Sequence, residues 1–449
     1  MSVRISQFDG KPNFPNEQPT SRREFLLRVF RPRQSMDALR EKQGGVVTAS
    51  YRGLRFVVAL SPEAAHEILA ADPDGYDAFW KESFTGLTGS GSLWVLSGKR
   101  HRQERQLLSP GFHGNSFGSM GTAIRDIARR RTGPWKSGTE VVAVETTFLI
   151  SRDVIMRVVF GIEDEALMRS GERVLSDLRK NLHPLVVFLP ALQRSWFPYW
   201  RKYRRAKLEF SAWLRDYLAY RRAHGGEKND VLGRMLSTPY PDGRLMSDED
   251  IRDELITILL AGHETTATAL AWAFYELSRH PAELEQLRGE LARLGPDPDP
   301  ALVAKLPRLS AVCNETLRLH TLLPEVARVL TAPTNMFGCM LPPGTSVVIS
   351  IMAIHHDPQL YPQPDRFSPQ RFLERSYSPY EFLPFGGGHR RCLGASLSDY
   401  EMRIVLAEIV THWDFEALGA EQEIRHDIAM GSRHGIRLRV RARELEPST

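Results

Sequence analysis

The sequence predicts a mainly α-helical protein with a minor β component, an α+β fold. Three observations predict it: helical periodicity from about residue 61 to 330, one very long helix candidate within that stretch, and extended runs near both ends. With 449 residues, 42% of them apolar, the chain can bury a large core. Because the strand-rich segments flank the helices and no linker separates them, we expect a single domain over residues 1–449, with residues 1–30 as an N-terminal extension.

The first β segment spans residues 46–60, where two β-branched runs flank Tyr51-Arg52-Gly53 and predict a hairpin. A helix should follow directly, because Ser61 suits an N-cap position and Pro62 suits the first turn.

The long helix candidate runs from Met246 to His280, with Ser247 as its cap and three acids in its first turn. At about 1.5 Å per residue it is long enough to cross a whole domain. Toward the C-terminus, the pattern predicts a strand at 345–349, a helix at 394–411 and a β-like tail at 435–442.

Composition excludes several classes of function. A formal charge of +5 is too small for a dedicated nucleic-acid binder. Cys313, Cys339 and Cys392 form no CxxC pair, which argues against a disulfide scaffold, a zinc ribbon and covalently attached haem. The N-terminus has no apolar signal region, and no segment approaches the roughly 18 apolar residues of a membrane span. We therefore expect a cytoplasmic protein.

The stretch Phe385-Gly-Gly-Gly-His-Arg-Arg-Cys-Leu-Gly394 is the most informative one. Its glycines let the backbone approach a flat ligand closely. Cys392 falls where the last helix begins, and a helix N-terminus favours a thiolate, which can hold iron. The alternatives are a plain glycine loop before a helix with a buried Cys, or zinc bound by His389 and Cys392, for which no second ligand pair lies nearby.

The second motif, Ala261-Gly-His-Glu-Thr-Thr266, lies in the middle of the long helix. An acid beside a threonine is out of place in an apolar helix interior. Thr265 can bond back to the carbonyl of Ala261 and, with Gly262, open a local bulge where oxygen, water and a proton donor meet. The alternative is a helix with an exposed polar stripe.

Two pairs of residues at helical spacing complete the pattern. Glu315 and Arg318 are three apart on a helix, which by itself is usually a surface ion pair of little value. His101 and Arg105 are four apart and face the same way.

In their order and separations, these four elements resemble the cytochrome P450 family of haem-thiolate monooxygenases over residues 30 to 442. The cysteine loop fits F-G-x-G-x-R-x-C-x-G at every fixed position. The resemblance implies a triangular fold with the long helix over the haem, non-covalent haem b (iron protoporphyrin IX) with Cys392 as axial thiolate, and Glu264 and Thr265 as the proton-delivering pair. It also implies a structural set of Glu315, Arg318 and Arg371. The cofactor-binding residues that it implies are His101, Arg105, Ala261, Arg328, Phe385, Arg390 and Gly394.

The implied activity is insertion of one oxygen atom from O2 into a C–H bond of a terpenoid, steroid or fatty acid. Electrons would come from a separate ferredoxin or flavodoxin with its NAD(P)H reductase, since no reductase is fused. A basic face would dock that partner; its residues would be Lys99, Arg100, Arg102, His389 and Arg391. The substrate pocket would draw on Phe79, Trp80, Phe84, Trp94, Val186, Phe188, Ile258, Leu322, Leu323 and Glu325, each of which is otherwise plain core.

Two positions depart from the family pattern: Thr321 replaces a usual proline, and Glu325 lies in a usually apolar segment. If it faces the cavity, Glu325 is paired with Arg328 or with a polar group of the substrate. Residues 188–200 fit a lid loop, whose aromatics alternatively graze a membrane. Two rival functions remain, a hydrogen-peroxide-dependent peroxygenase, against which the pair Glu264-Thr265 argues, and a non-catalytic haem or hydrophobe carrier.

Overall fold

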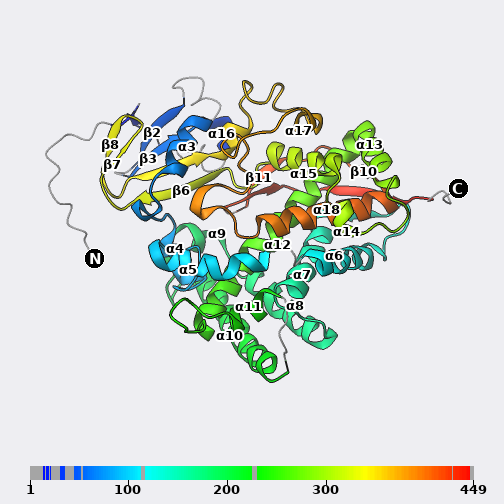
Figure 1. Cartoon of the computed structure of the whole chain (residues 1–449), viewed down its shortest axis with the longest axis horizontal. Helices are drawn as coiled ribbons and strands as arrows, with labels where there is room; N and C mark the ends of the chain where they lie inside the picture. Colours follow the sequence, from blue (N-terminus) through cyan, green and yellow to red (C-terminus); the bar gives the residue numbers. More distant parts are fainter. Residues whose placement is uncertain are drawn as a thin grey trace.

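A computed structural model of the chain describes residues 14–15, 17–19, 21, 31–35, 45–51, 54–112, 117–224, 230–426 and 428–444. The molecule is roughly triangular in the view of Figure 1, with most strands at one corner and helices filling the rest. The long helix α12 passes through the middle, and α10 lies at the lower vertex. Most of the predicted N-terminal extension, residues 1–30, lies outside the described residues.

Helices dominate the described chain. The α-helices are α3 (Pro62–Ala70), α4 (Lys81–Leu87), α5 (Gly98–Leu108), α6 (Phe117–Thr132), α7 (Ala143–Val158), α8 (Glu165–Lys180), α9 (Pro184–Phe188), α10 (Pro198–His224), α11 (Val231–Ser237), α12 (Asp248–Arg279), α13 (Pro281–Ala292), α14 (Pro300–Val303), α15 (Pro307–Leu319), α16 (Ile351–His355), α17 (Gln370–Glu374) and α18 (Ala395–His412). Short 3-10 turns are η1 (Pro73–Gly75), η2 (Ser109–Phe112), η4 (Pro190–Leu192) and η5 (Gly388–Arg390).

The strands join segments that are far apart in the sequence. They are β1 (Glu17–Pro19), β2 (Val46–Tyr51), β3 (Leu54–Ala59), β4 (Tyr76–Ala78), β5 (Glu140–Val142), β6 (Glu325–Leu330), β7 (Thr334–Met336), β8 (Cys339–Leu341), β9 (Ser346–Ser350), β10 (Trp413–Ala417), β11 (Glu423–Arg425), β12 (Met430–Ser432) and β13 (Arg437–Ala442). The largest sheet has the order β1-β2-β3-β9-β6-β4, so the blue N-terminal strands lie beside the yellow ones in Figure 1.

The predicted elements form where local sequence signals are strong. The β2–β3 hairpin is antiparallel, although its turn at Arg52-Gly53 lies outside the described residues. The Ser61 hydroxyl accepts from the Ala64 N–H at the start of α3, and Ser247 likewise caps α12. The expected helix at 394–411 is α18, and the expected tail is β13, which pairs with β10 and β5.

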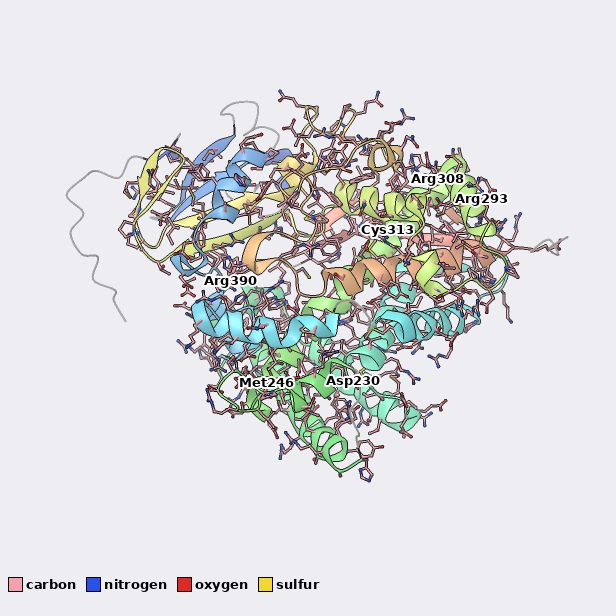
Figure 2. The ribbon with its side chains drawn as sticks, viewed as in Figure 1. Asp230, Met246, Arg293, Arg308, Cys313 and Arg390 are labelled. Carbon is pink, nitrogen blue, oxygen red and sulfur yellow. The ribbon has the colours of Figure 1, made fainter. Side chains whose placement is uncertain are left out.

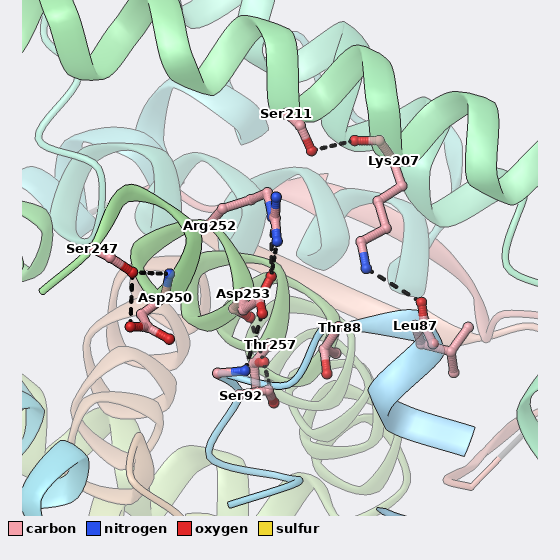
Figure 3. Close-up of polar contacts among 12 residues, drawn as sticks. Leu87, Thr88, Ser92, Lys207, Ser211, Ser247, Asp250, Arg252, Asp253 and Thr257 are labelled. Atoms are coloured by element: carbon pink, nitrogen blue, oxygen red, sulfur yellow. Dashed lines mark hydrogen bonds and ion pairs between the residues drawn. The ribbon is translucent and has the colours of Figure 1, made fainter. Parts of the chain in front are cut away.

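The N-terminal half of α12 is anchored to the loop that follows α4 (Figure 3). Asp253, which is buried, accepts from the Gly91 N–H at 3.0 Å, and the Thr257 hydroxyl lies 2.6 Å from that of Ser92. A Cβ on Gly89 would lie 2.0 Å from the Asp253 carboxylate, and its φ is +119°, so only glycine allows this approach. The same loop also contacts the cysteine segment, and it therefore connects the long helix to the site described below.

No described helix is long and apolar enough to cross a membrane.

Candidate active site

The cysteine loop between Phe385 and α18 is compact. The Cys392 N–H donates to the Phe385 carbonyl at 2.9 Å, and α18 begins three residues after the cysteine. Gly386 and Gly388 have φ values of +65° and +63°, and a Cβ on Gly388 would lie 3.1 Å from the Leu69 carbonyl oxygen. The loop therefore needs glycine at these positions to pack against α3.

The Cys392 side chain is exposed. Desolvation by the surrounding protein is the largest effect on its thiol and raises its pKa, while a backbone hydrogen bond from Gly394 and the charges of Arg105 and Arg391 lower it. Cys313 is fully buried and Cys339 half-buried; Figure 2 shows Cys313 well away from Arg390 of the cysteine loop.

Three guanidinium groups without acidic partners lie near the cysteine loop. Arg328 donates to the Gly387 and Ile68 carbonyls at 2.9 and 3.3 Å, and Arg390 donates to the Leu96 carbonyl and the Ser97 hydroxyl at 2.5 and 3.0 Å. Among the described residues, no carboxylate forms an ion pair with Arg105, Arg328 or Arg390.

Burial of these cations disfavours their charged form. Desolvation lowers the pKa of Arg328 to about 10, despite the favourable charge of Tyr76, and it also lowers the pKa of Arg105 and of Arg390. In addition, Arg328 and Arg390 repel each other. Such an arrangement is costly unless an anion lies beside these groups.

The two histidines beside the guanidinium groups are neutral. Desolvation and the charge of Arg390 lower the pKa of His101 to about 3, and desolvation and the charge of Arg328 lower that of His389 to about 4. Their rings meet edge to face at 5.9 Å. Each of them therefore offers a neutral N–H rather than a positive charge.

The central motif of α12 is the accessible part of that helix. Side chains around Ala261 to Thr265 are half-exposed, except that of His263, whereas the turns on both sides are buried. The Thr265 hydroxyl donates to the Ala261 carbonyl at 2.8 Å, as expected, but the helix is continuous, so the predicted local bulge is wrong.

Thr266 links this motif to the helix that follows the cysteine. Its hydroxyl lies 3.0 Å from the Ser398 hydroxyl of α18. The acid–threonine motif of α12 therefore lies beside α18, the helix that follows the cysteine loop.

Glu264 is bound to a partner that sequence analysis missed. Arg179 at the end of α8 donates to both of its carboxylate oxygens, at 2.5 and 3.1 Å, and packs over the Phe148 ring. Although desolvation raises it, the hydrogen bond from Arg179 lowers the pKa of Glu264, so this carboxylate is ionised at neutral pH. No sequence signal gives this contact, because the partners are 85 residues apart.

A small cavity adjoins this pair. Its volume is about 10 Å³, close to what one water molecule needs. Arg152, Arg179 and His263 line it together with aliphatic side chains of α7, α8 and α12. The polar groups could bind a water molecule next to Glu264.

Glu315 and Arg318 form a fully buried pair, not a surface pair. Two hydrogen bonds of 2.7 and 2.8 Å join them, and Arg371 reaches Glu315 at 3.1 Å. Thr321 donates to the Arg318 carbonyl at 2.9 Å, so the residue that replaces the usual proline satisfies a carbonyl at the end of α15. This set holds α15 against the segment that leads to α17.

The proposed pocket side chains fall into separate groups. One group is a chain of ring contacts: the ring centroids of Phe79 and Trp80 are 4.8 Å apart, and those of Trp80 and Phe188 are 5.8 Å apart. In another group, the ring centroids of Phe84 and Trp94 are 4.5 Å apart. Leu322 and Leu323 are half-exposed, and Ile258 is nearly buried. Val186 is fully buried in the core, and its place in the pocket stays a prediction.

Glu325 begins β6, opposite Ser350 of β9, and is half-buried. Alternation along the strand places it on the same sheet face as Ala327 and on the opposite face from Arg328. This alternation argues against the suggested Glu325–Arg328 pair, and the Arg328 guanidinium donates to backbone carbonyls.

The expected basic face is weaker than its sequence suggested. Arg100 pairs with Asp250 at 2.6 Å, Arg102 pairs with Asp74, and His389 is neutral. Lys99 and Arg391 remain exposed. No described group of three or more His, Cys, Asp or Glu side chains can hold a metal, which disfavours the zinc alternative at His389 and Cys392.

Comparison with known proteins matches almost the whole chain. The sequence model of the cytochrome P450 family matches residues 24–436. Putative cytochrome P450 138 of Mycobacterium tuberculosis is 34% identical over 404 residues, covering 87% of both chains. Putative cytochrome P450 135B1 of the same organism is 35% identical over 418 residues, covering 91% of this chain and 87% of its own.

Solved structures share the fold. A retinoic-acid-bound cyanobacterial CYP120A1 superposes with a TM-score of 0.83 at 22% identity, covering 96% of this chain and 100% of its own. The haem domain of cytochrome P450DA gives a TM-score of 0.81 at 23% identity, covering 96% and 98%. The expected mainly α fold with minor β is confirmed.

Proposed function

Because the chain belongs to the cytochrome P450 family, whose members are haem monooxygenases, we propose that it hydroxylates a hydrophobic substrate with O2 and that Cys392 is the thiolate ligand of haem b. Haem supplies the oxygen-activating chemistry when bound. The observation that carries the proposal is the accessible Cys392 beside three guanidinium groups that lack acidic partners.

The residues present fit haem. Its two propionates are the anions that Arg105, Arg328 and Arg390 lack, and guanidinium groups bind carboxylates strongly. Arg390 keeps a buried Nε without a hydrogen-bond partner among the described residues. His101 would add a neutral N–H donor. Arg105, whose charge acts on Cys392, would also favour the thiolate over the thiol.

Proton delivery would use Glu264 and Thr265. Glu264 is ionised and bound to Arg179, and a guanidinium does not release protons at neutral pH. A proton that passes through Glu264 must therefore come from water, for which the cavity beside Arg179 has room. Thr265 would hold the proton donor near the reacting oxygen, since its hydroxyl lies on the accessible face of α12.

Thr265→Ala should uncouple electron consumption from product formation without loss of haem. We expect product formed per electron to fall by roughly tenfold or more, since a positioned proton donor contributes roughly 10²–10⁴-fold. The measurement compares product, hydrogen peroxide and NAD(P)H consumed. Thr268→Ala is the matched control, because Thr268 makes the same i−4 bond, to the Glu264 carbonyl at 2.8 Å, but is buried. Equal coupling in both variants would refute the role of Thr265.

Electrons would come from a ferredoxin or flavodoxin that docks near Lys99 and Arg391. Arg391→Glu should slow reduction by an acidic ferredoxin by roughly tenfold at low salt, and high salt should remove most of the difference. Arg293→Glu is the control: Arg293 is also exposed, and Figure 2 shows it far from Arg390. If both variants were reduced equally fast in stopped-flow measurements, this docking surface would be wrong.

We infer a hydrophobic substrate of the terpenoid, steroid or fatty-acid class from the aromatic chain Phe79–Trp80–Phe188 and the half-exposed Leu322 and Leu323. Titration of the haem-loaded protein with these three classes would select among them, because a substrate that binds next to the haem would shift its Soret band. If none of the three classes shifted the Soret band, this substrate assignment would be wrong.

A further inference from the structure

We propose that His320 is a positioning residue, which holds the β11–β12 hairpin and the segment after α15 in place as one wall of the substrate pocket. This inference rests on the proposed function, because Leu322 and Leu323 of that segment line a pocket only if that function is correct. His320 acts through the residues that it holds and not by contact with substrate.

The His320 ring lies between two carboxylates from distant parts of the chain. Its Nε2 lies 2.9 Å from Oε1 of Glu276 in α12, and its Nδ1 lies 2.5 Å from Oε1 of Glu423 in β11. A neutral imidazole has one N–H and can donate to only one of these oxygens. Because both ring nitrogens face a carboxylate, the geometry favours the imidazolium, which donates to both.

The surroundings of the ring stabilise its positive charge. Desolvation lowers the pKa of His320, but the hydrogen bonds to Glu276 and Glu423 outweigh this effect and raise the pKa to about 9. The ring also stacks on the Trp272 indole, with centroids 3.9 Å apart and planes inclined by 8°. The nearby His356 adds no charge, because desolvation lowers its pKa to about 3. His320 is therefore a buried cation that joins two anions.

The hairpin has a second attachment to the segment that follows α15. The Met430 N–H in β12 donates to the Leu322 carbonyl at 2.7 Å. The two strands pair in antiparallel register, so they move as one unit. One strand is thus held by a side chain, at Glu423, and the other by its backbone, at Met430. Both attachments lie within two residues of each other along the chain, at His320 and Leu322.

Beyond these attachments the hairpin approaches the accessible middle of α12. Ile428, which follows β11, packs against the main hydrophobic core. Desolvation raises the pKa of Glu264, whereas Arg179 and, more weakly, His426 at the end of β11 lower it. The charge of His426 therefore acts on the acid–threonine motif. A shift of the hairpin would change the space above that motif without displacing the cysteine loop.

Charge at this position supplies direction as well as stability. A buried ion pair often stabilises a fold no more than apolar side chains of similar volume would. Charge-assisted hydrogen bonds, however, are short and directional. With one carboxylate on α12 and the other on β11, they fix the orientation of the ring and, through Glu423, the position of the strand.

The first test measures the hairpin itself in the haem-loaded full chain. His320→Gln and Glu423→Gln each remove one charge of the contact. We expect the amides of β11 and β12 to exchange with deuterium roughly tenfold faster in both variants, since a charge-assisted hydrogen bond is lost. The amides of α7 should exchange as in the native protein. Glu423 is half-exposed, so its variant keeps the test valid if His320→Gln does not fold.

His412→Gln is the matched control. His412, at the end of α18, pairs with Glu408 at 3.0 Å, and the hydrogen bond from this partner raises its pKa. The substitution therefore removes the same kind of paired histidine outside the hairpin. The amides of β11 and β12 should exchange at the native rate in this variant.

Ligand binding distinguishes a positioning role from a merely structural one. Imidazole and a phenyl-substituted imidazole both bind haem iron through nitrogen and shift the Soret band, but only the second carries a ring large enough to reach the pocket wall. We expect His320→Gln and Glu423→Gln to bind imidazole like the native protein. They should bind the phenyl-substituted imidazole roughly fivefold more weakly or worse, because a displaced wall loses its contacts.

Native exchange of the hairpin in both variants, an unchanged affinity for the phenyl-substituted imidazole, or an equal loss of affinity for the two ligands would each overturn the proposal. So would effects of His412→Gln that match those of His320→Gln. If imidazole failed to shift the Soret band of the native protein, the proposed haem ligation would be wrong, and the exchange rates would decide whether His320 holds the hairpin.

Discussion

Cys392→Ala is expected to abolish the thiolate signature of the reduced carbon monoxide complex, together with all oxygen-activating turnover. The side chain is the accessible sulfur of the site, and alanine offers no ligand to iron. Secondary structure should persist, because the backbone hydrogen bond from the N–H of residue 392 to the Phe385 carbonyl holds the loop, and the substitution retains it. The measurements are the absorption spectrum of the reduced carbon monoxide complex and circular dichroism.

Cys339→Ser is the matched control for this variant. Cys339 is half-buried in β8, outside the glycine loop of the sequence, and its loss should leave the spectrum unchanged. Cys313 is a poorer control, since serine at a fully buried site introduces a hydroxyl that needs a partner. A thiolate-type band that survived in Cys392→Ala and disappeared in Cys339→Ser would overturn the ligand assignment.

Arg318→Leu is expected to destabilise the fold by about 3–5 kcal/mol, because it leaves the Glu315 carboxylate buried without its main partner. Both side chains of the pair have no exposure, and Arg371 alone would remain beside Glu315. The measurement is the free energy of unfolding in urea, with haem retention followed in parallel.

A double variant separates lost pairing from lost packing. Glu315→Leu/Arg318→Leu removes both charges and should cost less than Arg318→Leu alone, since no unpaired carboxylate remains. If the double variant were the less stable of the two, the buried charge would not be the cause of the destabilisation.

Local signals in the sequence determine several elements of the fold. The caps at Ser61 and Ser247, the glycine positions before Cys392 and the length of α12 are all properties of neighbouring residues, and the structure agrees with them. The three-residue spacing of Glu315 and Arg318 also predicted their contact, but not its complete burial. Burial depends on α17, which lies more than fifty residues later.

Charge pairing across the fold could not be predicted in the same way. Arg102 counts as a free cation in the sequence, yet folding brings it to Asp74, and Glu264 finds Arg179 from a different helix. The neutrality of His101 and His389 likewise follows from desolvation and from guanidinium groups that meet only in the folded chain. For the same reason, the cluster of Arg105, Arg328 and Arg390 was expected from resemblance and not from spacing.

The origin of the inserted oxygen tests the central claim most directly. Turnover of the substrate selected by Soret titration, with NAD(P)H, a ferredoxin system and isotopically labelled O2, should place one labelled oxygen atom in each product molecule. Unlabelled product under labelled O2, or equal product from hydrogen peroxide without any reductant, would contradict an O2-dependent monooxygenase.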